Sequence, residues 1–300
     1  KDKFFIEVEC LQRNHISERI CGDVFKSGRV KEENRVVLVL SDGMGHGVKA
    51  NVLATLTATM ALKFTQEHKA LEKTAEIIMN TLPECSERKM SYATFTVVDI
   101  DMHGKTTILE YDNPKAFIIR NGKEFKPEWK TMELEGEIQV NRDLRVCSFT
   151  PRKNDRIIFC SDGITQSGLG SRELPFGWGR DNLISYVLMQ LEKKTDLSAR
   201  ELSYKILNVA NRNDGFNMKD DASAGTVYFR EPRKLLICTG PPYHEEKDPE
   251  MAAAIRDFSG KKIIMGATTA DVVARELELE IEDEMDLRDS DLPPIAHMPG

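Results

Sequence analysis

Two short, strongly apolar segments of the chain are each followed by the same tripeptide. Residues 35–40 (RVVLVL) and 155–160 (DRIIFC) run directly into Ser-Asp-Gly, at 41–43 and 161–163. A continuous apolar run of this length, rich in β-branched residues, predicts a buried strand. Buried strands need packed layers around them, and 40% hydrophobic residues in 300 supply a sizeable core.

Further strands and helices are predicted around these two segments. Three glycines within 41–47 permit a sharp turn, and residues 48–66 then have the i, i+4 apolar spacing of a helix. Residues 92–120 predict three strands in an antiparallel meander, with a turn at Asn121-Gly122. The other predicted strands are 3–11, 20–25 and 223–230, and the other predicted helices are 70–81, 181–193 and 198–212.

The last quarter of the chain has a different pattern. A strand at 234–239, a helix near 248–258, a strand at 261–265 and a helix near 269–280 predict a compact β-α-β-α unit. Glu-Pro-Arg at 231–233 interrupts the preceding strand. We therefore expect two domains, 1–232 and a smaller appendage, 233–300, which ends in an acidic tail.

Charge and composition exclude several classes of protein. The net charge is −7 and no basic run is present, so nucleic acid is not an expected partner. The six cysteines form no CxxC pair or Cys/His cluster, which argues against a zinc site or a disulfide framework. No apolar run approaches 18 residues, so we expect no membrane segment and a cytoplasmic location.

Four aspartates occupy equivalent places at strand ends. Asp42 and Asp162 follow the two buried strands, Asp23 lies on an early strand, and Asp220, preferred to its neighbour Asp221, precedes the strand at 223–230. Each taken alone is the pattern of an ordinary turn. Together they form an all-oxygen donor set without His or Cys, which favours Mg²⁺ or Mn²⁺ over zinc.

Other ligand-binding motifs do not fit the glycine-rich turn. Its spacing is GxGxG instead of the GxGxxG of dinucleotide-binding folds. Residues 42–53 lack the acids of a calcium-binding EF-hand loop, and the chain contains no GxSxG nucleophile motif.

The order of these motifs resembles the PPM family of metal-dependent Ser/Thr protein phosphatases, and specifically its SpoIIE-like bacterial branch. The resemblance spans residues 3–230 and rests on CGDVF (21–25), VLSDGMGHGVKA (39–50), IIFCSDGI (157–164) and DDASAGTV (220–227). It implies an α/β fold (α+β), the PPM-type αββα sandwich of two antiparallel sheets flanked by helices. The metals would lie between the sheets at one edge.

The resemblance also implies roles for individual residues. Asp42 would bridge two Mn²⁺ or Mg²⁺ ions, and the carbonyl of Gly43 would bind the first ion. Asp162 and Asp220 would bind the second ion, and Asp23 would orient the bridging water that attacks phosphorus. His46 is either a proton donor or simply the cap of the following helix.

Some positions depart from the wider family. The arginine that holds the substrate phosphate in eukaryotic relatives has no clear counterpart, and Arg19 and Lys26 are the nearest cations. Asn113 occupies the place of an acid that contributes to a third metal in many bacterial members, so two ions are expected. Asp112 would replace it only if the register slips by one.

The expected substrate is phosphoserine or phosphothreonine on a partner protein. In SpoIIE-like relatives this is often an anti-sigma-factor antagonist. The alternative is a PPM-fold pseudophosphatase or a regulatory module that binds a ligand or partner without hydrolysis. In the appendage, Thr268 and Thr269 begin a helix after a strand and a glycine, which predicts either a ligand or partner site or an ordinary helix cap.

Overall fold

The computed structural model describes residues 4–67, 93–101, 104–131, 144–283 and 296–299, together with Thr74, Ile77 and Thr81. Contacts divide the chain into two compact units, Lys1–Glu231 and Pro232–Gly300. Among the described residues, no helix has both the length and the apolar character that crossing a membrane requires. Each unit is described separately below.

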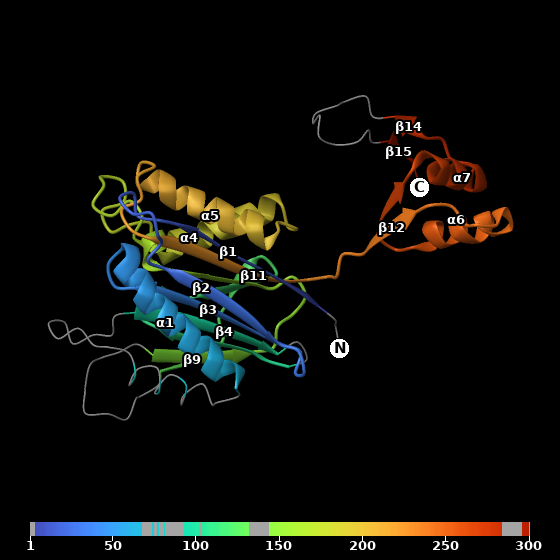
Figure 1. The fold of residues 1–300 in the computed structure, drawn as a ribbon. Helices are drawn as coiled ribbons and strands as arrows, with labels where there is room; N and C mark the ends of the chain where they lie inside the picture. Colours follow the sequence, from blue (N-terminus) through green and yellow to red (C-terminus); the bar gives the residue numbers. More distant parts are fainter. Residues whose placement is uncertain are drawn as a thin grey trace. The chain divides into compact units, whose positions relative to one another are not determined.

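The first unit contains two antiparallel sheets (Figure 1). The five-stranded sheet has the order β1 (Phe5–Arg13), β11 (Ala222–Arg230), β10 (Arg156–Cys160), β6 (Phe117–Arg120), β7 (Lys123–Phe125). The six-stranded sheet has the order β2 (Val24–Val30), β3 (Arg35–Gly43), β4 (Ala93–Asp101), β5 (Thr106–Tyr111), β9 (Leu144–Phe149), β8 (Trp129–Thr131).

The packing of strand β3 explains why its residues 36–40 are all apolar. Val37 and Val39 belong to the core cluster that includes Ala58 and Ala61 of helix α1 (Gly47–Gln66). Leu38 and Leu40 lie in a different cluster, which also contains Phe159 of β10 in the other sheet. Since successive side chains of a strand point to opposite faces, both faces of β3 are buried and neither tolerates a polar residue.

A second layer of helices covers the five-stranded sheet. Helices α4 (Arg180–Lys193) and α5 (Ala199–Asn213) pack on its outer face and share one core cluster with Ile158 and Cys160 of β10. A single helical turn, α3 (Asp162–Thr165), follows β10. Helix, sheet, sheet and helix therefore form four layers, which confirms the predicted sandwich of two antiparallel sheets.

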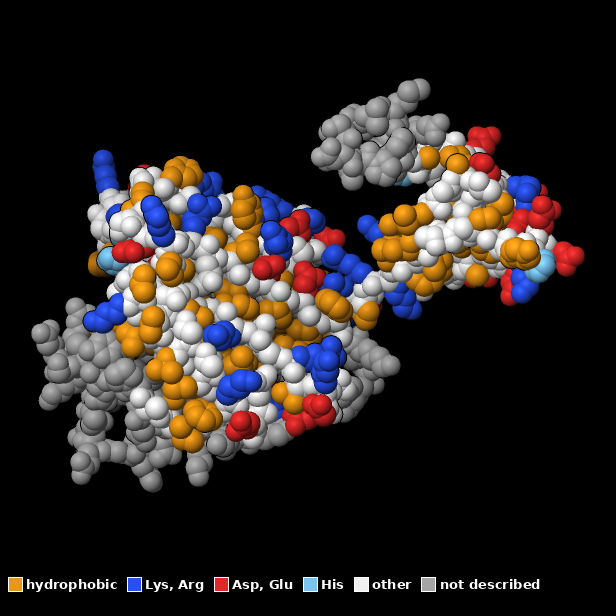
Figure 2. Space-filling model, in the orientation of Figure 1, with side chains coloured by type: hydrophobic (Ala, Val, Ile, Leu, Met, Phe, Trp, Pro, Cys, Tyr) orange, Lys and Arg blue, Asp and Glu red, His pale blue; other side chains and the backbone are white. Residues whose placement is uncertain are grey.

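Helix α1 packs on its sheet through small side chains. Its buried positions are Gly47, Ala50, Ala54, Thr57, Ala58, Ala61 and Thr65. The larger Val48, Val52 and Leu56 are exposed, and Figure 2 shows a band of hydrophobic side chains along this helix. Small residues on the buried face let the helix axis lie close to the strands.

The structure corrects the predicted meander. β4 and β5 are neighbours, but the third strand, β6, joins the other sheet and pairs with β10. Asp112 has a positive φ of 56° and Pro114 has no N–H to donate, so the strand cannot continue. The buried carboxylate of Glu110 accepts the backbone N–H of Ala116 at 2.6 Å and holds the crossing between the sheets.

Two further predictions differ from the structure or lie outside it. The second strand was expected at 20–25, but β2 begins at Val24, because the preceding residues form the loop that carries Asp23. The helix expected at 70–81 lies largely outside the described residues. Thr74, Ile77 and Thr81 are helical.

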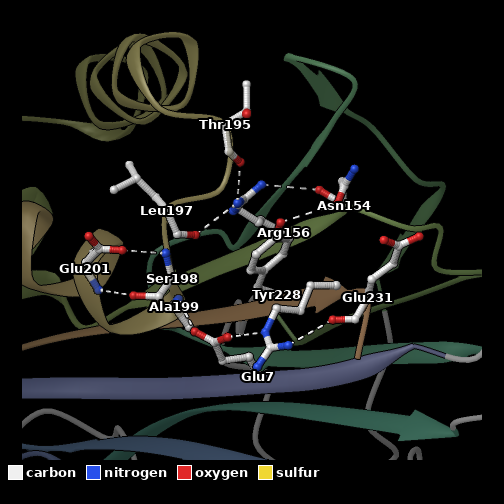
Figure 3. Close-up of polar contacts among 11 residues, drawn as sticks. Glu7, Asn154, Arg156, Thr195, Leu197, Ser198, Ala199, Glu201, Tyr228 and Glu231 are labelled. Atoms are coloured by element: carbon white, nitrogen blue, oxygen red, sulfur yellow. Dashed lines mark hydrogen bonds and ion pairs between the residues drawn. The ribbon is translucent and has the colours of Figure 1, made fainter. Parts of the chain in front are cut away.

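A polar network attaches α5 to the five-stranded sheet (Figure 3). The Arg156 guanidinium donates to the carbonyls of Thr195 and Leu197, at 2.8 and 3.0 Å, and lies over the Tyr228 ring. The carboxylate of Glu7 accepts the N–H of Ala199 at 2.8 Å. These contacts satisfy carbonyl and N–H groups at the start of α5, and so fix the helix against β1 and β11.

The second unit is a two-stranded parallel sheet covered by two helices. Strands β12 (Leu235–Thr239) and β13 (Lys261–Met265) alternate with helices α6 (Asp248–Asp257) and α7 (Ala267–Leu277). A short 3-10 turn, η1 (Glu245–Lys247), precedes α6, and β14 (Glu282–Asp283) pairs with β15 (Ala296–His297). Residues 284–295 of the acidic tail lie outside the described residues.

The capping box of α5 gives a test of this packing. The Ser198 hydroxyl accepts the N–H of Glu201, whose carboxylate accepts the N–H of Ser198. We expect Ser198→Ala to lower the free energy of unfolding by about 1 kcal/mol, because one N–H at the helix start loses its acceptor. Ser185→Ala, an exposed site inside α4, is the matched control and should change it by less than about 0.5 kcal/mol. Equal losses in urea unfolding would contradict this role of Ser198.

Candidate functional site

Two neighbouring strands of the six-stranded sheet bring a pair of acids to one edge. Asp42 lies at the end of β3, and Asp23 immediately precedes β2. The antiparallel register pairs Val24 with Ser41. Asp23 and Asp42 therefore lie at the same end of the same strand pair.

The five-stranded sheet repeats this arrangement. β10 ends at Cys160 and is followed by Asp162, while Asp220 and Asp221 precede β11. Cys160 pairs with Ala224, so the end of β10 lies beside the beginning of β11. The four predicted acids thus come from two sheets and meet at one edge of the sandwich.

Hydrogen bonds across the two sheets hold Asp23. The buried hydroxyls of Ser161, directly after β10, and Ser223, in β11, donate to its Oδ2 at 2.7 and 2.6 Å. Its Oδ1 is buried and has no hydrogen-bond partner among the described residues. One oxygen is therefore fixed by the opposite sheet, and the other is available to a ligand.

Asp42 and Asp162 lie close enough together in the cluster for each side chain to shift the pKa of the other. Burial, followed by the negative charge of Asp23, raises the pKa of Asp42 far above its ordinary value. Burial also raises the pKa of Asp162. Two neighbouring buried carboxyl groups are stabilised by a shared proton or by a cation between them.

The other two predicted acids, Asp23 and Asp220, also have raised pKa values. Burial raises the pKa of Asp23 to about 7, against the opposing effect of the two serine hydroxyls. Burial and the charge of Asp162 raise the pKa of Asp220 to about 6. All four predicted acids therefore have raised pKa values, which is typical of a functional site.

Asp221 has a different environment from Asp220. It is buried, and its Oδ1 accepts the N–H of His15 at 2.9 Å. Its Oδ2 lies against Gly22, where a Cβ would approach to 2.6 Å. Asp221 therefore ties the β1–β2 loop to the site, and the preference for Asp220 as a ligand stays a prediction.

The glycine after each Ser-Asp allows the backbone to pack closely. A Cβ at Gly43 would collide with the carbonyl of Ala50, and one at Gly163 with the carbonyl of Asp221. A side chain at either position would push the strand end away from its neighbour. The two Ser-Asp-Gly segments thus share a carboxylate and a close backbone contact, but their serines differ: Ser161 bonds Asp23, whereas Ser41 donates to the carbonyl of Thr94 at 2.8 Å.

His46 lies at the rim of the acid cluster. It is the N-cap residue of α1, but its side chain makes no capping hydrogen bond. Instead Nδ1 lies 2.7 Å from Oε1 of Glu18, and the ring stacks on His15 with centroids 4.6 Å apart. The ring is therefore oriented by Glu18 and His15, and half of the side chain remains exposed.

Asn113 is held by hydrogen bonds to strand β4. Its Nδ2 donates to Thr96 Oγ1 at 3.1 Å, and its Oδ1 accepts the hydroxyl of Thr94. The side chain is thereby engaged with β4. The number of ions remains a prediction.

The donor set of the cluster suits a hard cation. It consists of carboxylate and carbonyl oxygens, including the partnerless Oδ1 of Asp23, and Mg²⁺ and Mn²⁺ prefer such ligands. Within the described part of the chain, no three Asp, Glu, His or Cys side chains already stand at the spacing needed to hold one ion. Small rotations of the carboxyl groups, including separation of the Asp42–Asp162 pair, are therefore part of the expected binding.

The site predicted in the second unit lies in the first turn of α7. Thr269 is buried and Thr268 is exposed at the first turn of α7. Because β12 and β13 are parallel, this turn and residues 239–243 lie at the same end of their sheet. A ligand or partner site there stays a prediction.

Sequence reasoning missed three contributors to the site. Ser161 directly precedes Asp162 in the repeated Ser-Asp-Gly, which was an available signal, whereas Ser223 lies inside β11 and has no such signal. His15 carries no such signal, because only the course of the β1–β2 loop brings it onto His46.

Comparison with known proteins identifies the family. The family model of stage II sporulation protein E, SpoIIE, matches residues 32–230, about two thirds of the chain. This chain belongs to the SpoIIE family. The comparison with curated protein sequences gave no match.

Solved structures share the fold of this SpoIIE-family chain at low identity. The PP2C phosphatase domain and regulatory fragment of SpoIIE from Bacillus subtilis aligns with a TM-score of 0.60 and 17% identity, covering 77% of this chain and 64% of that one. The RsbU and RsbW domains of a Mycobacterium tuberculosis protein align with a TM-score of 0.60 and 16% identity, covering 85% and 69%. RsbX, solved in complex with magnesium, aligns with a TM-score of 0.52 and 17% identity, covering 76% and 97%.

The raised pKa values predict how metal-free protein depends on pH. An unfolded Asp titrates near 3.9, so the folded state binds protons more tightly. The contribution of these two groups to stability is therefore largest below the pKa of an unfolded Asp and is lost as pH rises through about 6 and about 7, where Asp220 and Asp23 ionise. Asp220→Asn removes a partly buried carboxylate that is ionised at pH 8, and we expect it to raise the melting temperature in EDTA at that pH by about 3 °C or more.

The matched control is a buried aspartate with a satisfied partner. Asp155 pairs with Arg120 at 2.6 Å and accepts the N–H of Arg152. Asp155→Asn should lower the melting temperature under the same conditions, because it leaves a mostly buried guanidinium without its counter-charge. A decrease for both variants would show that the charge of Asp220 does not destabilise the metal-free fold.

Proposed function

We propose that this SpoIIE-family chain is a metal-dependent serine/threonine protein phosphatase. The observation that carries the proposal is the meeting of Asp23, Asp42, Asp162 and Asp220 from two sheets at one edge. A cluster of buried carboxylates with raised pKa values costs stability unless cations occupy it. The fold shared with PP2C phosphatase domains supports the same activity.

Two Mn²⁺ or Mg²⁺ ions would be held by the strand-end oxygens. Asp42 and the carbonyl of Gly43 would hold one ion, and Asp42 together with Asp162 and Asp220 the other. When bound, such ions neutralise phosphoryl oxygens and lower the pKa of a water molecule to be used as nucleophile. The magnesium in RsbX is a property of that protein and supports the choice of ion here.

The protein's own groups would orient the reaction. Asp23, fixed by the hydroxyls of Ser161 and Ser223, presents Oδ1 toward the cluster and would accept a proton or hydrogen bond from the attacking water. His46, held by Glu18 at the exposed side of the cluster, would donate a proton to the departing serine or threonine oxygen. Rigid strand ends supply the positioning on which phosphoryl transfer depends.

The proposed substrate is phosphoserine or phosphothreonine on a partner protein in bacterial signalling, such as an anti-sigma-factor antagonist. RsbU and RsbW domains are found together in one solved neighbour, and another neighbour comes from the bacterial stressosome. These relationships support partner switching as the setting.

Metal-dependent hydrolysis tests the proposal. We expect p-nitrophenyl phosphate to be hydrolysed in Mn²⁺ and not in EDTA, with Asp42→Asn and Asp162→Asn each lowering kcat/KM at least a hundredfold. Asp257→Asn, an exposed aspartate in the second unit paired with Arg256, should retain wild-type activity.

Metal binding separates the proposal from its alternative. Mn²⁺ should raise the melting temperature of the wild type more than that of Asp42→Asn, measured without substrate. Binding without turnover would instead support a pseudophosphatase. No calorimetric signal for Mn²⁺ would refute the metal site itself.

His46 has its own prediction. His46→Gln keeps a polar side chain beside Glu18 but removes the proton donor, so kcat should fall about tenfold to a hundredfold while KM changes little. The loss should be smaller for p-nitrophenyl phosphate, whose leaving group needs no proton, than for a phosphoserine peptide. An equal loss for both substrates would indicate a structural role.

A further inference from the structure

Three loops meet beside the acid cluster. They are the β1–β2 loop, the α3–α4 loop and the α5–β11 loop, and all lie near the start of α1 in Figure 1. The N–H of Ile16 donates to the carbonyl of Met218 at 3.0 Å, and the N–H of Gly168 donates to Oδ1 of Asp214 at 2.7 Å. These bonds join the loops into one surface.

Each of these loops carries at least one large apolar side chain in solvent, and Ile20 and Phe176 are also exposed on the first two. Ile16 is 60% exposed, Leu169 is 48% exposed and Phe216 is 69% exposed. We call these three residues the apolar rim. Single exposed apolar residues are common, but three on loops that are bonded to each other around one site are not explained by packing.

Phe216 has a backbone conformation that its side chain does not favour. Its φ is +64°, directly after Gly215 with φ +65°. A bulky residue in the left-handed region is an outlier, and asparagine or glycine would adopt it at less cost. Because the ring is mostly exposed, burial does not repay this strain, which points to a role outside folding.

The polar groups among the loops fit an anionic partner. Lys219 Nζ donates to the carbonyl of Leu169 at 3.3 Å, which places its positive charge between the α3–α4 and α5–β11 loops. The backbone N–H of His15, one residue before Ile16, binds Asp221 at the acid cluster. The apolar rim therefore begins where the phosphoryl group would be bound.

We propose that the apolar rim docks a phosphorylated segment of a partner protein in which large apolar residues flank the phosphoserine or phosphothreonine. This rests on the proposed phosphatase function and adds a substrate preference to it. The apolar neighbours of the phosphorylated residue lie on Ile16, Leu169 and Phe216, while the phosphoryl group reaches the acid cluster. The main chain of the segment passes over the three joined loops.

Two synthetic phosphoserine peptides test the preference. One has leucine at the two positions on each side of phosphoserine, and the other has glycine there. In Mn²⁺ we expect the wild type to hydrolyse the leucine peptide with a kcat/KM at least tenfold higher. Phe216→Asn should remove most of this preference, retain activity toward p-nitrophenyl phosphate and leave the melting temperature unchanged or higher.

The control is an exposed aromatic residue on the outer surface of α5. Tyr204→Asn should keep the peptide preference. Ile16→Ser and Leu169→Ser should each weaken it in the same direction as Phe216→Asn. A parallel loss for both peptides and for p-nitrophenyl phosphate would overturn the proposal, since it would show that Phe216 only supports the site.

Binding measurements separate this proposal from the phosphatase activity. Fluorescence anisotropy of the labelled peptides, with Mn²⁺, should show about tenfold tighter binding of the leucine peptide to the wild type and none of this gain for Phe216→Asn. That result would support the apolar rim even if no peptide were hydrolysed. Equal binding of both peptides, or dissociation of a dimer on Phe216→Asn in analytical ultracentrifugation, would overturn it.

Discussion

The face-to-face packing of the two sheets is the constraint on which the site depends. Leu38 and Leu40 of one sheet meet Ile157 and Phe159 of the other, and helices bury the outer faces. Burying an unpaired charged group inside these layers would cost a large free energy. The strand ends at one edge are where carboxylates can come together while their backbones stay rigid, and that is where Asp42 and Asp162 lie.

This arrangement places stability and function in opposition at a few positions. Asp23, Asp42, Asp162 and Asp220 all have pKa values raised chiefly by burial, so their ionised forms are unfavourable in the metal-free fold. The sandwich around them, with its continuous apolar strands, is rigid enough to hold them together. Phe216, beside the site, likewise has a backbone conformation that lowers the stability of the fold.

Much of the fold was predictable because its elements have strong local patterns. The fully apolar β3 and β10, the helices α4 and α5 and the β-α-β-α order of the second unit were all expected close to their observed bounds. The path of β6 was not, because adjacent strands in sequence usually pair. The turn at Asp112 and Pro114, with the carboxylate of Glu110 on Ala116, directs it to the other sheet, and such contacts have no periodic signal.

The sequence by itself determined which strands are buried and which acids follow them, since hydrophobic period and the repeated Ser-Asp-Gly are local properties. The tertiary structure decided which side chains meet. The inter-sheet bonds from Ser161 and Ser223 to Asp23, and the stacking of His15 on His46, join residues up to 200 positions apart. Such contacts depend on sheet register and loop course, and both follow from burying the two inner faces together.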